Sequence, residues 1–403
     1  MPLFFFPNRP VSRKMRLPHD PPLSWLQLTH NRSRFLVAVA GIAFATLLMF
    51  MQLGFQGALY KTATDIHRHF LADIVLTGPR TENFFDAGLY QTFTKRYLAR
   101  ARQVEGVASV APLYIGFGHW KNPIADVNRQ ILIFGFDPDK PAFNLPEVQQ
   151  HLEDIKRSDV VLFDRMSKPD YGPITSAFEN GDTVTTEVNN CRVVVKGLFS
   201  LGGSIFSAAG VIITSDLNFA RLVRRPLSHV SVGLIRLRPD ANVDEVLQAL
   251  KKQYSGGVRV QTLQRYMERE KVYWKQGSPI GSIFTIGTVM GFVVGLVIVY
   301  QVLYSEVADN LSHYATLKAL GYSQKYFYRL ILEQAILLSC LGYIPGFLFS
   351  IVLYKAVVEV VRLPAEMDII RAISVFLFTA LMCGVAGFMA TKKLRQADPA
   401  DIF

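Results

Sequence analysis

The chain has 403 residues, of which 50% are hydrophobic and only 19% are charged. A soluble domain of ordinary composition has about a quarter of its residues charged. Here the apolar excess is concentrated in long runs, which excludes an ordinary soluble protein. The net charge of +11 does not indicate a nucleic-acid partner, because many Lys and Arg residues flank apolar runs, as is typical of membrane topology. The three cysteines, Cys191, Cys340 and Cys383, do not have the spacing of a disulfide framework or a metal site.

The N-terminal segment, residues 1–34, is basic and contains a candidate surface helix. The apolar run Phe4–Phe6 is too short for a cleavable signal sequence. A pair of prolines precedes an apolar pattern that includes Leu23, Trp25 and Leu28. This pattern predicts a short amphipathic helix at the membrane surface, and a disordered tail is the alternative. We therefore expect a cytoplasmic tail with one amphipathic helix.

Four uncharged runs are long enough to cross a membrane as helices, for which about 20 residues suffice. The expected transmembrane helices are residues 35–60, 276–304, 334–354 and 372–391. Within the third, Pro345 predicts a kink. Basic residues before the first run and after the last run place both termini in the cytoplasm. These residues are Arg32, Arg34, Lys392, Lys393 and Arg395.

The segments between the runs follow from this topology. Residues 61–275 are expected to form a large periplasmic domain and residues 305–333 a cytoplasmic segment. Residues 355–371 are then a short periplasmic loop, and residues 392–403 a second cytoplasmic tail. The sequence thus predicts an α-helical membrane protein with four transmembrane helices and a large periplasmic domain between the first two.

The expected periplasmic domain mixes strand and helix patterns, which indicates an α/β fold. Asn189 and Asn190 separate two strand patterns and predict a hairpin, and Ser215 is a candidate helix cap. The predicted strands are 73–77, 107–114, 130–136, 160–163, 183–188, 192–199, 211–214, 229–237 and 258–262. The predicted helices are 89–103, 144–155, 216–222, 243–253 and 263–276, the last running directly into the second span. A β-rich insert is expected at about residues 116–225.

The cytoplasmic segment contains a polar helical pattern over residues 304–323. Val307, Leu311, Tyr314 and Lys318 recur at helical spacing, and Gly321 marks the helix end. Because the pattern lies between two spans and is charged, we expect one helix of about four turns on the membrane surface.

The sequence contains none of the common nucleotide-binding, hydrolase or zinc-binding motifs that we considered. It has no GxxxxGK[ST] phosphate-binding loop, no GxSxG and no HExxH. The spans have no Asp, Glu, Lys, Arg or His in their middles, whereas ion-coupled transporters usually need such groups. His67 and His69 form an HxH pattern without nearby further ligands, and we expect them on the surface of a stalk. We therefore predict no catalytic, cofactor-binding or metal-binding residue, and expect the energy for any transport to enter from outside the chain.

The arrangement of one span, a large extracytoplasmic domain and three further spans resembles the FtsX/MacB class of ABC permeases. In that class a segment of the type Glu…Glu-Ile-x-x-Leu-[Lys/Arg]-Ala-[Leu/Met]-Gly joins the second and third spans. Here Glu306 corresponds to the first Glu of this segment, and residues 313–322 correspond to the rest. His313 stands where the class has an acidic residue. Four stretches resemble the DevC branch, the permease subunits of cyanobacterial heterocyst glycolipid exporters. They are residues 22–29, 39–44, 48–55 and 314–319.

The resemblance implies a transport subunit without its own ATPase, in the bacterial inner membrane. It implies a homodimer that works with a separate ABC ATPase. It also implies a porter-like periplasmic domain that meets a periplasmic adaptor (membrane-fusion) protein and, through the adaptor, a TolC-like outer-membrane channel. The residues that it implies for ATPase coupling are Glu306, His313, Tyr314, Thr316, Leu317, Lys318, Ala319, Leu320, Gly321 and Tyr322.

Three functions remain open for such a permease. The first is the ATP-driven export of a glycolipid or another amphiphile through a tripartite assembly. The second is extraction of lipoproteins together with a related permease. The third is an FtsX-like transmitter that controls a periplasmic hydrolase and transports nothing. A membrane-anchored periplasmic enzyme is disfavoured, because no catalytic constellation is present.

Overall fold

The computed structural model describes residues 23–89, 91–202, 210–254, 256–361 and 364–396. The chain divides into two compact units. The first, here called the helical unit, comprises Met1–Phe50, Val289–Ser350 and Ile369–Phe403. The second, here called the sheet unit, comprises Met51–Thr288 and Ile351–Asp368.

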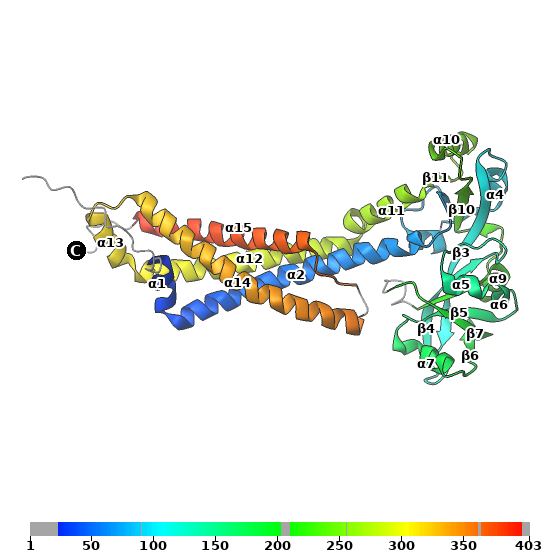
Figure 1. Ribbon diagram of the computed structural model, residues 1–403, viewed down its shortest axis with the longest axis horizontal. Helices are drawn as coiled ribbons and strands as arrows, with labels where there is room; N and C mark the ends of the chain where they lie inside the picture. Colours follow the sequence, from blue (N-terminus) through cyan, green and yellow to red (C-terminus); the bar gives the residue numbers. More distant parts are fainter. Residues whose placement is uncertain (1–22, 90, 203–209, 255, 362–363, 397–403) are drawn as a thin grey trace, which may run out of the picture. The chain divides into compact units, whose positions relative to one another are not determined.

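The helices and strands are numbered as in Figure 1. The helices are α1 (Leu23–His30), α2 (Arg32–Arg68), α3 (Phe84–Leu89), α4 (Arg96–Ala101), α5 (Pro146–Gln150), α6 (Leu152–Ile155), α7 (Ile174–Glu179), α9 (Asp216–Val223), α10 (Val243–Gln253), α11 (Leu263–Val272), α12 (Pro279–Asp309), α13 (Leu311–Ala319), α14 (Gln324–Val361) and α15 (Ile369–Gln396). A 3-10 turn lies at Pro169–Tyr171 and a π-helical turn at Tyr273–Gly277. The strands are β1 (Ile74–Thr77), β2 (Phe93–Thr94), β3 (Val107–Lys121), β4 (Asn128–Phe136), β5 (Val160–Asp164), β6 (Thr185–Val188), β7 (Cys191–Phe199), β8 (Val211–Ser215), β9 (His229–Val230), β10 (Val232–Leu237) and β11 (Arg259–Thr262).

Among the described residues, four helical stretches are long and apolar enough to cross a membrane. They are Arg32–Arg68, Pro279–Asp309, Gln324–Glu359 and Ile369–Thr391, so the prediction of four spanning helices is confirmed. Each is longer than the uncharged run that predicted it, because the helix continues into flanking polar residues. Pro345 lies inside α14.

The helical unit is held together by small side chains between its helices. Its core combines Ala38 and Ala45 of α2 with buried residues of α12, α14 and α15 (Figure 1). A Cβ atom at Gly41 would lie 2.5 Å from Ile298 Cγ2, and one at Gly295 would lie 2.7 Å from Ala45 Cβ. Helix association in membranes relies on such close backbone approach. The glycines therefore set the spacing of α2 and α12.

The sheet unit contains one mixed sheet. Among the described residues, nine strands follow the order β11-β1-β10-β3-β4-β8-β5-β7-β6, and β2 and β9 form a separate pair. The pairs β4–β8 and β5–β7 are parallel. Strands β4 to β8 all come from the predicted β-rich insert, but β3 crosses its boundary near residue 116 and pairs with both β10 and β4. The insert and the remaining strands therefore share one sheet.

Both faces of the sheet are buried under helices. Along β4, Ile131 and Ile133 enter one core and Leu132 and Phe134 enter the other, as the alternation of a strand requires. The first core is covered by α4, α7, α9 and α10, and the second by α3, α5, α6, α11 and the end of α2.

Several local predictions are confirmed. Asn189 and Asn190 have φ values of 49° and 63° and join β6 to β7 with Val188 opposite Cys191. This left-handed pair is the turn that an Asn-rich two-residue hairpin adopts. The Ser215 hydroxyl accepts a hydrogen bond from the backbone N–H of Asn218 at 3.3 Å, and so caps the start of α9.

Two helix predictions are wrong. The helix expected over residues 89–103 is instead α3, β2 and α4, because Phe93 pairs with Val230 of β9. The helix expected to run from residue 263 directly into the second span is interrupted by the π-helical turn and by Ser278, which is extended with φ −95° and ψ 135°. The residue before a proline avoids the helical region, and Pro279 then begins α12.

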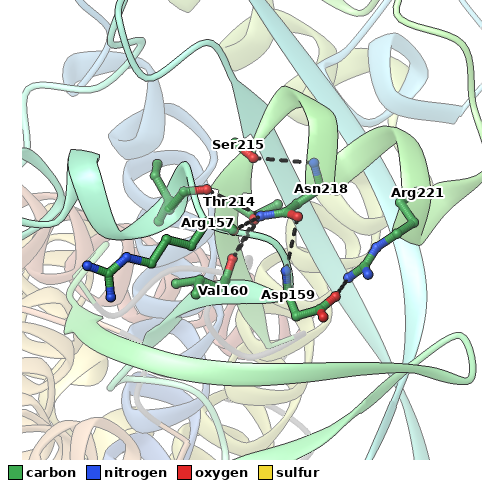
Figure 2. A network of polar contacts seen from close by, with 8 residues as sticks. Arg157, Asp159, Val160, Thr214, Ser215, Asn218 and Arg221 are labelled. Carbon is green, nitrogen blue, oxygen red and sulfur yellow. Dashed lines mark hydrogen bonds and ion pairs between the residues drawn. The ribbon is translucent and has the colours of Figure 1, made fainter.

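The Asn218 side chain joins three elements of the sheet unit (Figure 2). Its amide nitrogen donates to the carbonyl oxygens of Arg157 at 2.9 Å and Ile155 at 3.2 Å, and its oxygen accepts from the Asp159 amide at 3.2 Å. Asp159 has a φ of 70° and forms an ion pair with Arg221. The buried amide therefore holds the left-handed turn that leads from α6 into β5.

Replacing Asn218 by Ala should lower the free energy of unfolding by about 3 kcal/mol, because the substitution leaves buried backbone groups without partners. The measurement is denaturant unfolding of the full chain, followed by the fluorescence of buried Trp120. The control is Asn144→Ala at an exposed position of the same unit, which should cost less than about 0.5 kcal/mol. Equal losses in both variants would contradict the role of Asn218.

Replacing Gly295 by Leu should lower the thermal midpoint of the purified protein by about 3 °C or more, because a Cβ there would lie 2.2 Å from Met382 Sδ of α15 and 2.7 Å from Ala45 Cβ of α2, so the added side chain forces both helices away from α12. The matched control is Gly384→Leu on α15, where no described atom lies within 4 Å of an added Cβ. Unchanged thermal stability of the Gly295 variant would show that close packing of these helices is not required.

Candidate functional site

Residues 304–323, expected to form a single helix, are divided between the end of α12 and the separate helix α13. α12 ends at Asp309 and α13 begins at Leu311. Between them, the Asn310 side chain donates to the Glu306 carbonyl oxygen at 2.9 Å and to Glu306 Oε1 at 3.0 Å. A short amide side chain that bonds the backbone competes with the regular helix, which accounts for the break.

The end of α13 has a fixed geometry. Gly321 has a φ of 90°, and the Tyr322 amide donates to the Leu317 carbonyl oxygen at 3.2 Å. This arrangement is the Schellman motif, which favours glycine in the left-handed position. The prediction that the helix ends at Gly321 is confirmed.

One face of α13 is anchored to the start of α14. Tyr314 is buried, and its ring packs edge-on against Phe327 at 5.6 Å between centroids. Val307 and the partly buried Leu317 belong to the same cluster, together with Leu330 and Ile331 of α14. Burial raises the pKa of Tyr314 to about 12, so the hydroxyl stays neutral. α13 is therefore packed firmly against the helix that follows it.

The other face and the end of α13 are exposed. His313 and Thr316 are exposed, and the side chains of Leu320 and Tyr322 are 72% and 48% exposed. Lys318 and Ala319 complete the helix, and their side chains lie outside the described part of the structure. Large apolar side chains on a rigid helix end are suited to insertion into a protein partner.

The sequence-predicted coupling residues therefore divide into two groups. Tyr314 and Leu317 belong to the cluster packed against α14, and the half-buried Glu306 bonds to Asn310 and lines a cavity. The exposed group is His313, Thr316, Leu320, Gly321 and Tyr322. Among the coupling residues whose side chains the structure describes, the exposed group is available to a partner without rearrangement.

Helix α1 is a part of this site that the sequence did not indicate. The Gln334 amide of α14 donates to Gln27 Oε1 at 3.0 Å, and the Ser24 hydroxyl donates to Glu333 Oε2 at 3.5 Å. A cavity of about 730 Å³ is lined by α1, the start of α2, the end of α12 and α13. The sequence predicted a helix at the membrane surface here. Its hydrogen bonds to α14 join residues more than 300 positions apart in the sequence, so no local pattern could indicate them.

An ion pair joins the start of α2 to the end of α12. It is formed by Arg34 and Asp309, whose side chains are both about half exposed. Exposed pairs of this kind contribute only about 0–1 kcal/mol. The ion pair therefore joins the start of α2 to the end of α12 but contributes little to the free energy of folding.

His67, expected on a stalk surface, is instead fully buried. Its ring packs against Tyr266 at 4.8 Å and Phe84 at 5.0 Å between centroids. The prediction failed because α2 continues to Arg68 and its last turn covers one face of the sheet.

Two family models match the chain. A MacB-like periplasmic core domain matches residues 35–253, and an FtsX-like permease C-terminal domain matches residues 283–399. The domain between the first and second spans is therefore periplasmic. Permease domains of these types are transmembrane components and not ATPases.

Solved structures match part of the chain at low sequence identity and with TM-scores below 0.5. The periplasmic region of MacB from Actinobacillus actinomycetemcomitans is 12% identical with a TM-score of 0.35, and the match covers 52% of this chain and 96% of that one. The extracellular domain of the noncanonic ABC-type transporter YknZ from Gram-positive bacteria is 10% identical with a TM-score of 0.31, and the match covers 47% of this chain and 99% of that one.

No curated protein matches the chain significantly. The match to the periplasmic core model nevertheless spans more than half of the chain, and the second model accounts for the last three spans. The chain therefore belongs to the MacB-like family of ABC permeases, which combine a MacB-like periplasmic core domain with an FtsX-like permease domain.

Proposed function

We propose that the chain is a permease subunit that transmits the motion of a separate ABC ATPase to its periplasmic domain. The observation that carries the proposal is the exposed apolar end of α13, formed by Leu320 and Tyr322 on a fixed turn. In this proposal the ATPase docks on this end, and both termini lie on the same, cytoplasmic side as α13.

The chain connects α13 directly to the two spanning helices α12 and α14, which supports transmission of motion from α13 through these helices. α13 packs on the start of α14 through Tyr314 and Phe327, and one residue separates it from α12. α12 is a single helix from Asp309 back to Pro279, where it meets the π-helical turn and α11. A displacement of α13 therefore acts directly on two spanning helices, one of which leads into the sheet unit.

The cargo that we propose is a glycolipid or another amphiphile. The uncharged spans offer no path for a polar solute, which supports export that does not cross the interior of this chain. In this proposal two copies of the chain form a homodimer of the DevC branch. A periplasmic adaptor and a TolC-like outer-membrane channel complete the assembly.

Transmission of motion through α12 would also suit two other functions. An FtsX-like transmitter would use it to control a periplasmic hydrolase, and a lipoprotein-extracting permease would use it beside a related second permease. The partner recovered with the chain separates the three: an adaptor indicates the exporter, a hydrolase the transmitter, and a homologous permease the extraction system.

Replacing Leu320 by Asp should weaken ATPase binding at least about tenfold, because a charge then replaces a large apolar side chain in the proposed interface. Leu320 is preferred to Leu317, which packs in the core of the segment. The measurement is the affinity of the ATPase for the full chain in nanodiscs, with ATP-dependent export as a second readout.

The matched control is Leu217→Asp, which makes the same change at a side chain that is 69% exposed on α9 of the sheet unit. This variant should bind the ATPase like the wild type. Unchanged binding of the Leu320 variant, or an equal loss in the control, would refute docking at the end of α13.

A further inference from the structure

A polar pocket lies beside the end of α9 in the sheet unit. It is formed by the last residues of β3, the first residue of β4, the turn between β6 and β7, and the end of α9. Its volume is about 400 Å³, within the range of about 300–1,000 Å³ that is typical of small-molecule sites. The lining includes His119, Asn128, Asn189, Asn190, Leu222 and Arg224.

The Asn189 side chain ties these elements together, so the pocket is preformed. Its Oδ1 accepts a hydrogen bond from the backbone N–H of His119 at 2.8 Å, and its Nδ2 donates to the Leu222 carbonyl oxygen at 2.8 Å. Oδ1 also lies 3.3 Å from His119 Nδ1. Because an amide oxygen can only accept, Nδ1 carries the proton in this contact, and Nε2 of the neutral ring is an acceptor.

The other polar side chains of the pocket are available to a ligand. In the described ranges, the side chains of Asn128, Asn190 and Arg224 form no hydrogen bond or ion pair within the chain, and no acidic residue lines the pocket. An amide group both donates and accepts hydrogen bonds, whereas a guanidinium only donates and is permanently positive. These groups together suit a ligand that has both hydroxyl groups and a negative charge.

Arg224 has an unusual backbone conformation for an arginine. It ends α9 in the left-handed region, with φ 55° and ψ 40°. Glycine or asparagine is the usual residue in this conformation at a helix end, and an arginine costs conformational free energy there. Residues in such conformations cluster at functional sites. The helix end therefore supplies the pocket with a positive charge where a small neutral residue would be more favourable for folding.

We propose that this pocket binds an acidic sugar, a pyranose that carries one carboxylate or phosphate group. Arg224 would pair with the negative group, because a guanidinium can form two parallel charge-assisted hydrogen bonds with it. Asn128 and Asn190 would exchange hydrogen bonds with the ring hydroxyls, and Leu222 and Val223 supply apolar contacts. A simple carboxylate would leave the two amides unused, and a neutral sugar would leave the guanidinium unpaired.

This site stands independently of ATPase docking. The acidic sugar has two possible sources, the headgroup of a membrane glycolipid and a soluble glycan, which share the chemistry that the pocket recognises. Only the assignment of a glycolipid headgroup would connect the pocket with the proposed export of an amphiphile, and that assignment alone rests on the proposed function.

The test is calorimetric titration of the full chain in nanodiscs with sodium glucuronate and, separately, with glucose 6-phosphate. Glucose has the ring without the charge, whereas acetate and inorganic phosphate have the charge without the ring. We expect at least one acidic sugar to bind at least about tenfold more tightly than glucose and than the simple anion of the same kind, because charge-assisted and neutral hydrogen bonds then act together.

Two variants separate the two parts of the ligand. Arg224→Asn keeps a residue that tolerates the left-handed conformation, and it should abolish the preference for the acidic sugar over glucose. Asn190→Gly keeps the hairpin turn, and it should weaken binding of the acidic sugar at least about threefold without changing the binding of the simple anion.

Two control variants should bind the acidic sugar like the wild type. Arg238→Asn makes the same change as Arg224→Asn at an exposed arginine after β10 that does not line the pocket. Leu320→Asp alters only the proposed ATPase interface, so a failure of the sugar site and a failure of ATPase docking are distinguishable.

Vesicles that contain a glucuronosyl diacylglycerol identify the source of the sugar. Displacement of bound acidic sugar by these vesicles would assign the pocket to a glycolipid headgroup, and displacement by free acidic sugars alone would assign it to a soluble glycan. Both results support the acidic-sugar site.

Three results would overturn it. The first is a wild-type chain that binds neither acidic sugar, a result that needs no variant to fold. The second is equal affinity for the acidic sugar and its simple anion, which would leave an unspecific anion site. The third is an equal loss of binding in Arg224→Asn and Arg238→Asn.

Discussion

The close approach of α2 and α12 is the packing constraint on which the rest of the structure depends. Gly41 faces Ile298 and Gly295 faces Ala45, so these positions leave no room for a side chain. The same two helices bracket the periplasmic domain in the sequence, since the domain follows the end of α2 and precedes the start of α12. Small residues at such an interface allow the two helix backbones to pack closely.

The two ends of α12 carry different chemistry. At one end the break at Asn310 leads to α13, whose fixed apolar tip, Leu320 and Tyr322, is suited to a protein partner. At the other end the π-helical turn is held by the buried Glu270 carboxylate, which accepts a hydrogen bond from Trp274 Nε1. In the proposed mechanism the ATPase acts on the first end, and the second end leads into the sheet unit.

Local patterns predicted the features that depend on neighbouring residues. The uncharged runs indicated the four spans, Asn189 and Asn190 the hairpin, and Gly321 the end of α13. Two failures have local causes that the patterns did not reveal, namely the helix breaks at Ser278 and Asn310. The others involve contacts between distant residues. Strand pairing of Phe93 with Val230 replaced a helix, and the sheet buried His67. The α1 contacts with α14 and the burial of Glu270 belong to the same class. The resemblance to the FtsX/MacB class implied the ATPase-coupling candidates, and packing then separated their exposed side chains from their buried ones.

In the proposed mechanism, nucleotide binding to the ATPase changes the conformation of the periplasmic end of α12. The most direct measurement is hydrogen–deuterium exchange of the full chain in complex with its ATPase, compared between ADP and a non-hydrolysable ATP analogue. We expect exchange to change both in α13 and in the π-helical turn Tyr273–Gly277. A change confined to α13, with the turn unaffected, would contradict transmission through α12.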